Sequence, residues 1–152
     1  MADPTSDRLR VRLVTPERIL FEADASAVEL PAKNGYMEVL YGHAPLLAEL
    51  GAGDVTIHGT AAGAAAAETA DAMRYNVSWG FVEVLPNRVT ILASDALKPE
   101  EIDVPRAERQ LDHGLELWKQ AGESEEAYDE ALRVISEAEA KIASAGGSIK
   151  TH

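Results

Sequence analysis

Apolar and polar residues alternate over most of the first 95 residues of the chain. Leu9, Val11 and Leu13 alternate with arginines, and the stretch from Met73 to Trp79 repeats the pattern. A period of two puts successive side chains on opposite faces of a strand, so one face of each strand is expected to be buried. Beyond Gly80, two more alternating stretches flank Pro86-Asn87, which predicts a hairpin with a tight turn.

Glycine and proline divide the rest of this region into short segments. Five of these segments are expected to be strands: Ile19 to Ala23, Ala27 to Leu30, Tyr36 to Leu40, Leu46 to Leu50 and Asp54 to His58. Strands that recur every ~8 to 12 residues are typical of a β sandwich or barrel. The Ala/Gly-rich stretch from Thr60 to Ala72 lacks large apolar residues, which predicts a surface loop between two strands.

From residue 96 onward the apolar residues recur every three or four positions. Such spacing gives a helix one apolar stripe, so the sequence predicts two amphipathic helices. The first stripe comprises Val104, Ala107, Leu111, Leu115 and Trp118, and the second comprises Tyr128, Ala131, Ile135, Ala138, Ile142 and Ala145. Asp103 and Ser124 are expected to cap the N-termini of these helices.

A short link around Gly122 joins the two helices, so they are expected to form an antiparallel hairpin. The predicted fold is a β sandwich over residues 1–95, followed by an antiparallel α-helical hairpin over residues 96–145 and a frayed tail over residues 146–152. Because both stripes are narrow and rich in alanine, the hairpin is expected to bury little area and to be the less stable unit.

The chain is acidic, with 26 Asp and Glu against 14 Lys and Arg among 152 residues and a formal net charge of -12 at pH 7. A nucleic-acid backbone would be repelled by most of this surface, so no nucleic-acid partner is expected. The absence of cysteine excludes disulfides and thiolate metal sites. No stretch reaches the ~20 apolar residues that span a bilayer, and the N-terminal residues lack the pattern of a secretion signal, which predicts a soluble protein.

No catalytic constellation stands out in the sequence. No two of the histidines are spaced four residues apart, as a helical metal-binding pair would be: His43, His58, His113 and His152. The phosphate-binding pattern G-x-x-x-x-G-K-[ST] is absent as well. The acidic residues of the predicted helices point outward and are interpreted as a solvated face. We therefore expect neither catalysis nor a bound metal.

Five blocks of sequence resemble the epsilon subunit of F-type ATP synthases. GYMEVLYGHAPLL, from Gly35 to Leu47, is similar to the family's G-x-x-G-x-L-x-G-H-A-P-L-L segment, and VTPERILF, from Val14, is similar to its first strand and turn. The remaining blocks resemble the family's S-G-G-F-x-E-V, V-T-I-L-A and I-D-x-x-R-A: SWGFVEV from Ser78, VTILA from Val89 and EIDVPRA from Glu101. The blocks follow the family's order, and the resemblance extends over residues 9–145.

The resemblance implies a non-catalytic subunit of the central rotor stalk. In this family the sandwich binds the gamma subunit and the polar loops of the membrane c-ring, so that proton-driven rotation is coupled through gamma to ATP synthesis in the alpha/beta head. The protein would lie peripherally on the cytoplasmic face of the bacterial inner (plasma) membrane and would touch that membrane only through the complex. The alternative is a free-standing sandwich and hairpin that senses a ligand or acts as an adaptor.

The expected interface with gamma or the c-ring lies in the segment from Lys33 to Ala44. Four residues are predicted to make its contacts: Tyr36, Glu38, Tyr41 and His43. The alternative is that this segment only shapes a turn. Glu38 and Trp79 stand where the family usually has glycine, and Trp79 is expected to fill space in the core. The alternative is that Trp79 adds a surface aromatic to the gamma contact.

In inhibitory members of the family the hairpin can extend into the catalytic head and block ATP hydrolysis. There, basic residues of the second helix meet an acidic segment of the catalytic subunit. The candidates for such contacts here are Arg133 and Lys141, but they are outnumbered by acidic residues on the same helix. We therefore expect weak or differently controlled braking, because the acidic surface would be repelled.

Some members of the family bind regulatory ATP through the I-D-x-x-R-A motif. The corresponding residues are Ile102, Asp103, Arg106 and Ala107, in which the arginine would meet phosphate. The alternative is that Asp103 caps the helix and Arg106 pairs with a carboxylate. Leu97 and His113 replace an acidic residue and an arginine that ATP-binding members use, so no cofactor is the first expectation.

Overall fold

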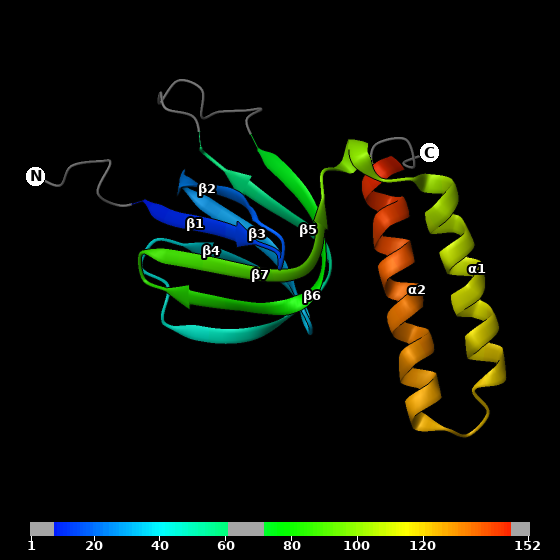
Figure 1. Cartoon of the computed structure of the whole chain (residues 1–152). Helices are drawn as coiled ribbons and strands as arrows, with labels where there is room; N and C mark the ends of the chain where they lie inside the picture. The colour runs from blue at the N-terminus through cyan, green and yellow to red at the C-terminus, as the bar shows by residue number, and fades with distance from the viewer. Residues whose placement is uncertain (1–7, 61–71, 147–152) are drawn as a thin grey trace, which may run out of the picture. The chain divides into compact units, whose positions relative to one another are not determined.

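The computed structural model describes residues 8–60 and 72–146. The chain divides into two compact units, Met1–Ala96 and Leu97–His152, and each is described by itself (Figure 1). Most of the loop predicted from Thr60 to Ala72 lies outside the described residues. So do residues 147–152 of the predicted tail, whereas Gly146 is the last residue of the second helix.

Seven strands form the first unit. They are β1 (Leu9–Val14), β2 (Ile19–Ala25), β3 (Ala27–Ala32), β4 (Gly35–Leu40), β5 (Leu46–His58), β6 (Met73–Leu85) and β7 (Arg88–Leu97). They are hydrogen-bonded in the order β2-β1-β7-β6-β5-β3-β4, and β1 runs parallel to β7. The sheet folds over on itself, as Figure 1 shows, which confirms the predicted β sandwich.

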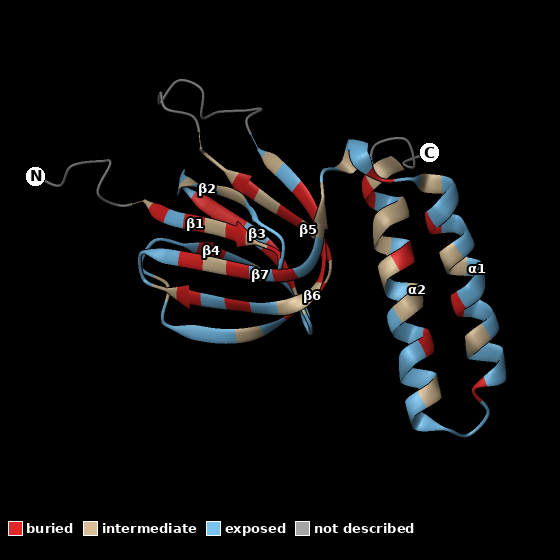
Figure 2. Ribbon diagram, viewed as in Figure 1, coloured by how far each residue is buried: buried red, intermediate tan, exposed pale blue. Residues whose placement is uncertain are grey.

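The predicted alternation accounts for the core of this unit. Leu9, Val11 and Leu13 are fully buried, and the arginines between them face outward. Figure 2 shows a similar alternation along the second half of β5 and the first half of β7. The core is built mainly from branched aliphatic residues, including Val28, Leu30, Val39, Val55, Ile57, Val77, Val82, Val84, Val89 and Ile91.

Glycines bend the long strands instead of ending them. The segments Leu46–Leu50 and Asp54–His58 were expected as two strands, but both belong to β5, which continues through Gly51 and Gly53. The register against β3 shifts in this stretch, because Glu29 pairs with Thr56 while Ala32 pairs with Leu50. The separate-strand prediction is wrong because glycine lets the backbone bulge while the strand keeps its pairing with β6.

The second unit is the predicted antiparallel hairpin of α1 (Val104–Gln120) and α2 (Glu125–Gly146), preceded by the 3-10 turn η3 (Pro99–Glu101). The predicted caps are confirmed. The Asp103 carboxylate accepts a hydrogen bond from the Arg106 backbone N–H at 3.1 Å, and the Ser124 hydroxyl accepts one from that of Ala127 at 3.1 Å.

Small residues form the seam between the two helices. Buried small residues recur every seven positions along the seam: Ala107, Gly114 and Ala121 on one side, and Ala131 and Ala138 on the other. Ser144 of α2 is buried outside this spacing. The predicted stripes are partly wrong, because Leu115, Trp118 and Tyr128 are exposed. Glycine and alanine let the helix backbones approach closely, so the seam follows the small residues and the large side chains lie beside it.

Candidate partner interface

A row of exposed apolar side chains crosses the outer face of the sheet. Val14 on β1 is paired with Ile19 on β2 and with Leu92 on β7, so the three residues are neighbours across three strands. Ile19 is 46% exposed and Leu92 is 48% exposed, although each lies within a regular strand. Large apolar side chains in adjacent strands therefore remain open to solvent.

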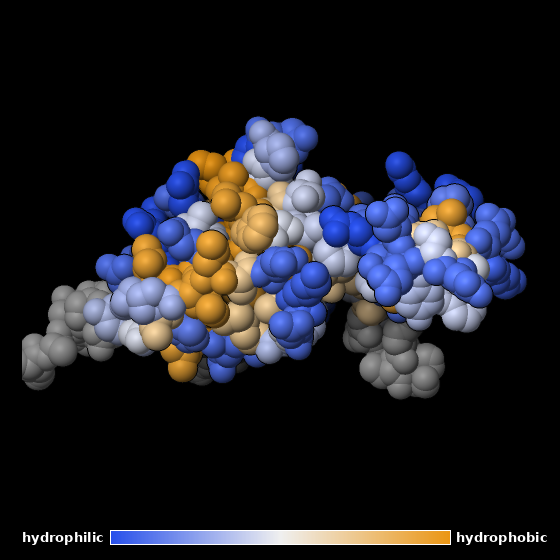
Figure 3. Space-filling model, turned by 90° about the horizontal axis from the view of Figure 1, so that it is seen from below, coloured by the Kyte–Doolittle hydropathy of each residue, from blue (hydrophilic) through white to orange (hydrophobic). Residues whose placement is uncertain are grey.

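The row continues onto β6 and β5. Phe81 directly follows Gly80 on β6. Gly80 packs closely against β7, because an added Cβ there would overlap the carbonyl oxygen of Leu92. Phe81 is paired with Glu49 of β5 and lies diagonally from Leu47, which is 70% exposed. Figure 3 shows apolar side chains gathered on this unit, with hydrophilic ones among and around them. Ile19, Val14, Leu92, Phe81 and Leu47 are called the apolar row below.

The sequence contains a signal for the apolar row, although the row was not predicted from the sequence. Val82 and Val84 are fully buried, so Phe81 and Glu83 occupy the outward phase of β6. Leu92 likewise takes the outward phase between the buried residues Ile91 and Ala93. A large apolar residue in the polar phase of an alternating strand is a sign of an interface.

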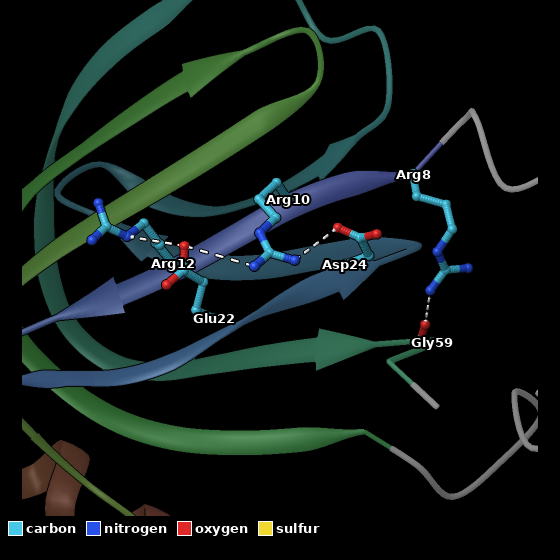
Figure 4. Close-up of polar contacts among 6 residues, drawn as sticks. All are labelled: Arg8, Arg10, Arg12, Glu22, Asp24 and Gly59. Carbon is cyan, nitrogen blue, oxygen red and sulfur yellow. Dashed lines mark hydrogen bonds and ion pairs between the residues drawn. The ribbon is translucent and has the colours of Figure 1, made fainter. Parts of the chain in front are cut away.

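Ion pairs lie on the same face of β1 and β2 as Val14, since Arg10, Arg12 and Val14 share one phase of β1. Figure 4 shows these ion pairs. Arg10 lies 3.3 Å from the Asp24 carboxylate and 3.8 Å from that of Glu22, and the Nε of Arg12 lies 3.4 Å from Glu22. Arg8 donates a hydrogen bond to the carbonyl oxygen of Gly59. The outer face of β1 thus changes from polar at its start to apolar at Val14.

The four residues predicted for the interface do not form one cluster. Tyr36 lies near the start of β4 and Tyr41 directly follows its end, so the two are separated by ~16 Å at the rise of an extended strand. Glu38 lies between them, exposed on this edge strand and paired with Glu29 of β3. Tyr36 has a structural role as well, since its hydroxyl accepts a hydrogen bond from the backbone N–H of Asp54 at 2.9 Å.

Tyr41 and His43 lie together in the turn between β4 and β5. Tyr41 is 45% exposed, and the Nδ1 of His43 lies 2.8 Å from the carbonyl oxygen of Ala44. The backbone N–H of Gly42 donates a hydrogen bond of 2.7 Å to the carbonyl oxygen of Pro86. This contact ties the turn to the β6–β7 turn, so the two turns form one end of the sandwich.

The first unit matches a family model described as ATP synthase, Delta/Epsilon chain, beta-sandwich domain, over residues 8–99. The chain belongs to this ATP synthase epsilon-chain family. The ATP synthase epsilon chain of Solibacter usitatus is 37% identical over 140 residues, which cover 91% of this chain and 96% of that protein. The ATP synthase epsilon chain of Koribacter versatilis is 40% identical over 105 residues, which cover 68% of this chain and 66% of that protein. The predicted resemblance is confirmed.

A solved relative agrees with the fold. A chain in the mitochondrial ATP synthase of Euglena gracilis, described as an OSCP/F1/c-ring assembly, superposes with a TM-score of 0.70 at 19% identity, covering 88% of this chain and 79% of that one. Among the described residues, no helix is long and apolar enough to cross a membrane. In the same part of the chain, no group of three or more His, Cys, Asp or Glu side chains is placed to hold a metal ion.

The epsilon-chain motif at the start of α1 supplies two buried and two exposed residues. Ile102 and Ala107 are 8% and 2% exposed, so they serve as packing residues. Asp103 and Arg106 are exposed, but the Asp103 carboxylate already accepts the Arg106 backbone N–H. The motif therefore acts in this structure as a helix start, and its only exposed cation is the Arg106 guanidinium.

The two basic residues predicted to contact the catalytic head differ in their surroundings. Arg133 is exposed on α2. The Lys141 side chain is only 12% exposed, and its Nζ lies 3.1 Å from a carboxylate oxygen of Glu137. Lys141 thus already has an anionic partner one turn away on its own helix.

Proposed function

We propose that this epsilon-family chain is a non-catalytic subunit of the central stalk of an F-type ATP synthase, and that its apolar row docks on the gamma subunit. The observation that carries the proposal is the row itself, in which apolar side chains on β2, β7, β6 and β5 stay exposed beside the half-buried Val14 of β1. Apolar surface that is continuous and bordered by polar groups is typical of a protein interface. The row's ion-paired border supplies such a rim.

A rotor subunit must transmit torque without deforming, and the sandwich suits this task. Its strands are joined through a single hydrogen-bonded sheet around a core of fully buried aliphatic residues. Close packing of this kind resists compression. The free-standing sensor or adaptor has no comparable support, because the family match favours the stalk and the row gives the stalk a docking face.

The end of the sandwich that carries Tyr41 and His43 is proposed to meet the polar loops of the c-ring. Its two turns are held together by the bond from Gly42 to Pro86, so the end is fixed in shape. Contact with the membrane would then be indirect, through the ring. In a bacterium the chain would then lie on the cytoplasmic face of the plasma membrane.

The hairpin is proposed to brake ATP hydrolysis only weakly, because it is acidic and Lys141 is already paired. Replacement of the full chain by one ending at Leu97 is expected to raise the ATPase rate of the gamma-containing head by less than about twofold. A severalfold rise in that rate would contradict the proposal.

The docking proposal is tested by affinity for the isolated gamma subunit. Phe81→Ser and Leu92→Ser remove central members of the row and are expected to weaken binding at least about tenfold. Leu40→Ser is the matched control, because it makes the same kind of change at an exposed site of β4 outside the row. Unchanged affinity in both row variants, with the fold verified by circular dichroism, would refute docking through the row.

A further inference from the structure

The helical hairpin carries a second exposed apolar surface. Leu115 and Trp118 on α1 are 41% and 47% exposed, and Tyr128 and Leu132 on α2 are 43% and 39% exposed. These four residues are called the hairpin face. Figure 3 shows apolar surface on the helical unit, bordered by hydrophilic side chains.

The four residues lie on one side of the hairpin. Leu115 and Trp118 follow the seam residue Gly114 by one and four positions, and Leu132 follows the seam residue Ala131 by one. Tyr128 precedes Ala131 by three positions, which reaches the same side of α2. Seen along the hairpin axis, the residue positions of one helix advance clockwise and those of its antiparallel partner advance counter-clockwise. Residues that follow their own seam residue by the same number of positions therefore lie on the same side of the hairpin.

The residues are also at one level along the helix axes. An added Cβ at Gly114 would lie 2.8 Å from Ile135 and 3.1 Å from Val134, which fixes the pairing of the helices. By that pairing Leu115, Trp118, Tyr128 and Leu132 fall within ~9 Å along the axis, at 1.5 Å per residue. They therefore form one compact surface near the turn that joins the helices.

Acidic residues surround this face. Their positions around the helix axes lie on the same side of the seam as Leu115 and Leu132, or slightly farther from the seam. These acidic residues are Glu108, Asp112, Glu125, Asp129 and Glu139. All five are exposed. On the other side of the seam acidic residues such as Glu130 and Glu137 are accompanied by Arg106, Arg109 and Lys141. Lys119, one turn after Leu115 on α1, is an exposed cation on the same side as the hairpin face. Around the apolar side chains acidic residues therefore outnumber basic ones.

We infer that the hairpin face binds a basic amphipathic helix of a partner protein, in which apolar anchors are flanked by Lys and Arg. An apolar surface with an acidic rim is complementary to such a helix both in hydrophobicity and in charge. A symmetric dimer would bring two acidic rims together, and an anionic membrane would be repelled. The inference goes beyond the stalk assignment, because it concerns the helical unit and needs no gamma subunit to be tested.

The test uses the full chain and two synthetic helical peptides. Both carry Leu at positions i, i+3, i+4 and i+7, and they differ only in having Lys or Glu at the flanking positions. Isothermal titration calorimetry is expected to show saturable binding of the Lys peptide, weakened by salt, and none of the Glu peptide. Trp118→Ala and Leu132→Ser are expected to weaken binding at least about tenfold, because they remove the anchoring surface.

Matched charge variants decide whether the rim acts locally. Glu125→Gln with Asp129→Asn is expected to weaken binding of the Lys peptide about tenfold, whereas Glu126→Gln with Glu130→Gln, on the same turns of α2, is expected to change it less than about twofold. Equal effects of the two pairs, equal binding of both peptides or no binding of either would overturn the inference. Self-association of the chain that Trp118→Ala abolishes would also overturn it in favour of a dimer.

Discussion

The hydroxyl of Tyr36 on β4 reaches across β3 and accepts a hydrogen bond from the backbone N–H of Asp54 on β5. The register shift between β3 and β5 leaves this stretch of β5 without regular pairing to β3. The Tyr36 hydroxyl thus satisfies a donor that the sheet does not, and it also covers Gly53, where an added Cβ would overlap it.

Tyr36→Phe is therefore expected to lower the free energy of unfolding by about 1 kcal/mol, the usual value of one hydrogen bond. Urea denaturation followed by circular dichroism measures the change. Tyr41→Phe is the control, because Tyr41 lies exposed in a turn. Equal stability of the Tyr36 variant and the unaltered chain would show that the bond contributes nothing.

Gly80→Ala is expected to destabilise the sandwich by about 3 kcal/mol or more, since it adds a steric overlap to backbone strain. Gly80 has φ 138°, and an added Cβ would overlap the carbonyl oxygen of Leu92. Gly35→Ala isolates the strain, because Gly35 has φ 134° but no atom within 4 Å of the added Cβ. Thermal or urea unfolding that gives equal losses for the two variants would exclude the overlap.

Gly114→Leu is expected to disrupt the pairing of α1 and α2. Even a Cβ at this position would lie 2.8 Å from the Cγ1 of Ile135, so a leucine side chain cannot fit the seam. Loss of helical signal at a lower temperature than for the unaltered chain is the expected readout. His113→Leu is the control on the neighbouring exposed position. If the two variants melted alike, the close seam would be wrong.

Titration of the chain with ATP up to millimolar concentration is expected to release no heat of binding. Asp103 is engaged as the cap of α1, while Ile102 and Ala107 are buried, so the motif offers only Arg106 to a phosphate. A saturable isotherm that Arg106→Ala removes would contradict this and would assign a regulatory nucleotide to the hairpin.

The sequence predicted most of the fold because alternation and helical spacing each report directly on burial. Leu9, Val11 and Leu13 are buried as the alternation indicates, and Asp103 and Ser124 cap their helices. The prediction of the hairpin was wrong where it placed large residues such as Leu115 and Trp118 in the buried stripe. The close approach of Gly114 to α2 instead placed the small residues in the seam.

The backbone conformation of Trp79 could not be predicted from the alternation of apolar and polar residues. Its φ of 56° lies in the left-handed region, which costs an ordinary residue ~1–2 kcal/mol and suits the glycine that the family usually has there. Trp79 is only partly buried, so the expectation that it fills the core is wrong. Trp79 lies between two paired positions, since Gly80 pairs with Leu50 and Ser78 pairs with Ala52 of β5. Its backbone conformation thus depends on pairing with a strand distant in the sequence.

The candidate interface was predicted only in part, for a similar reason. Tyr41 and His43 lie together in one turn, but Tyr36 lies at the far end of β4. The apolar row joins residues from five strands whose order along the chain differs from their order in the sheet. Its members become neighbours only through the pairing of β1 with β7 and of β5 with β6.

The central claim is that the sandwich unit binds the stalk. Size-exclusion chromatography of a gamma-containing catalytic head, mixed with the full chain or with a chain ending at Leu97, tests it most directly. Both chains are expected to elute with the head in a one-to-one complex, because the apolar row lies wholly within the first unit. Elution of both chains apart from the head would contradict the stalk assignment.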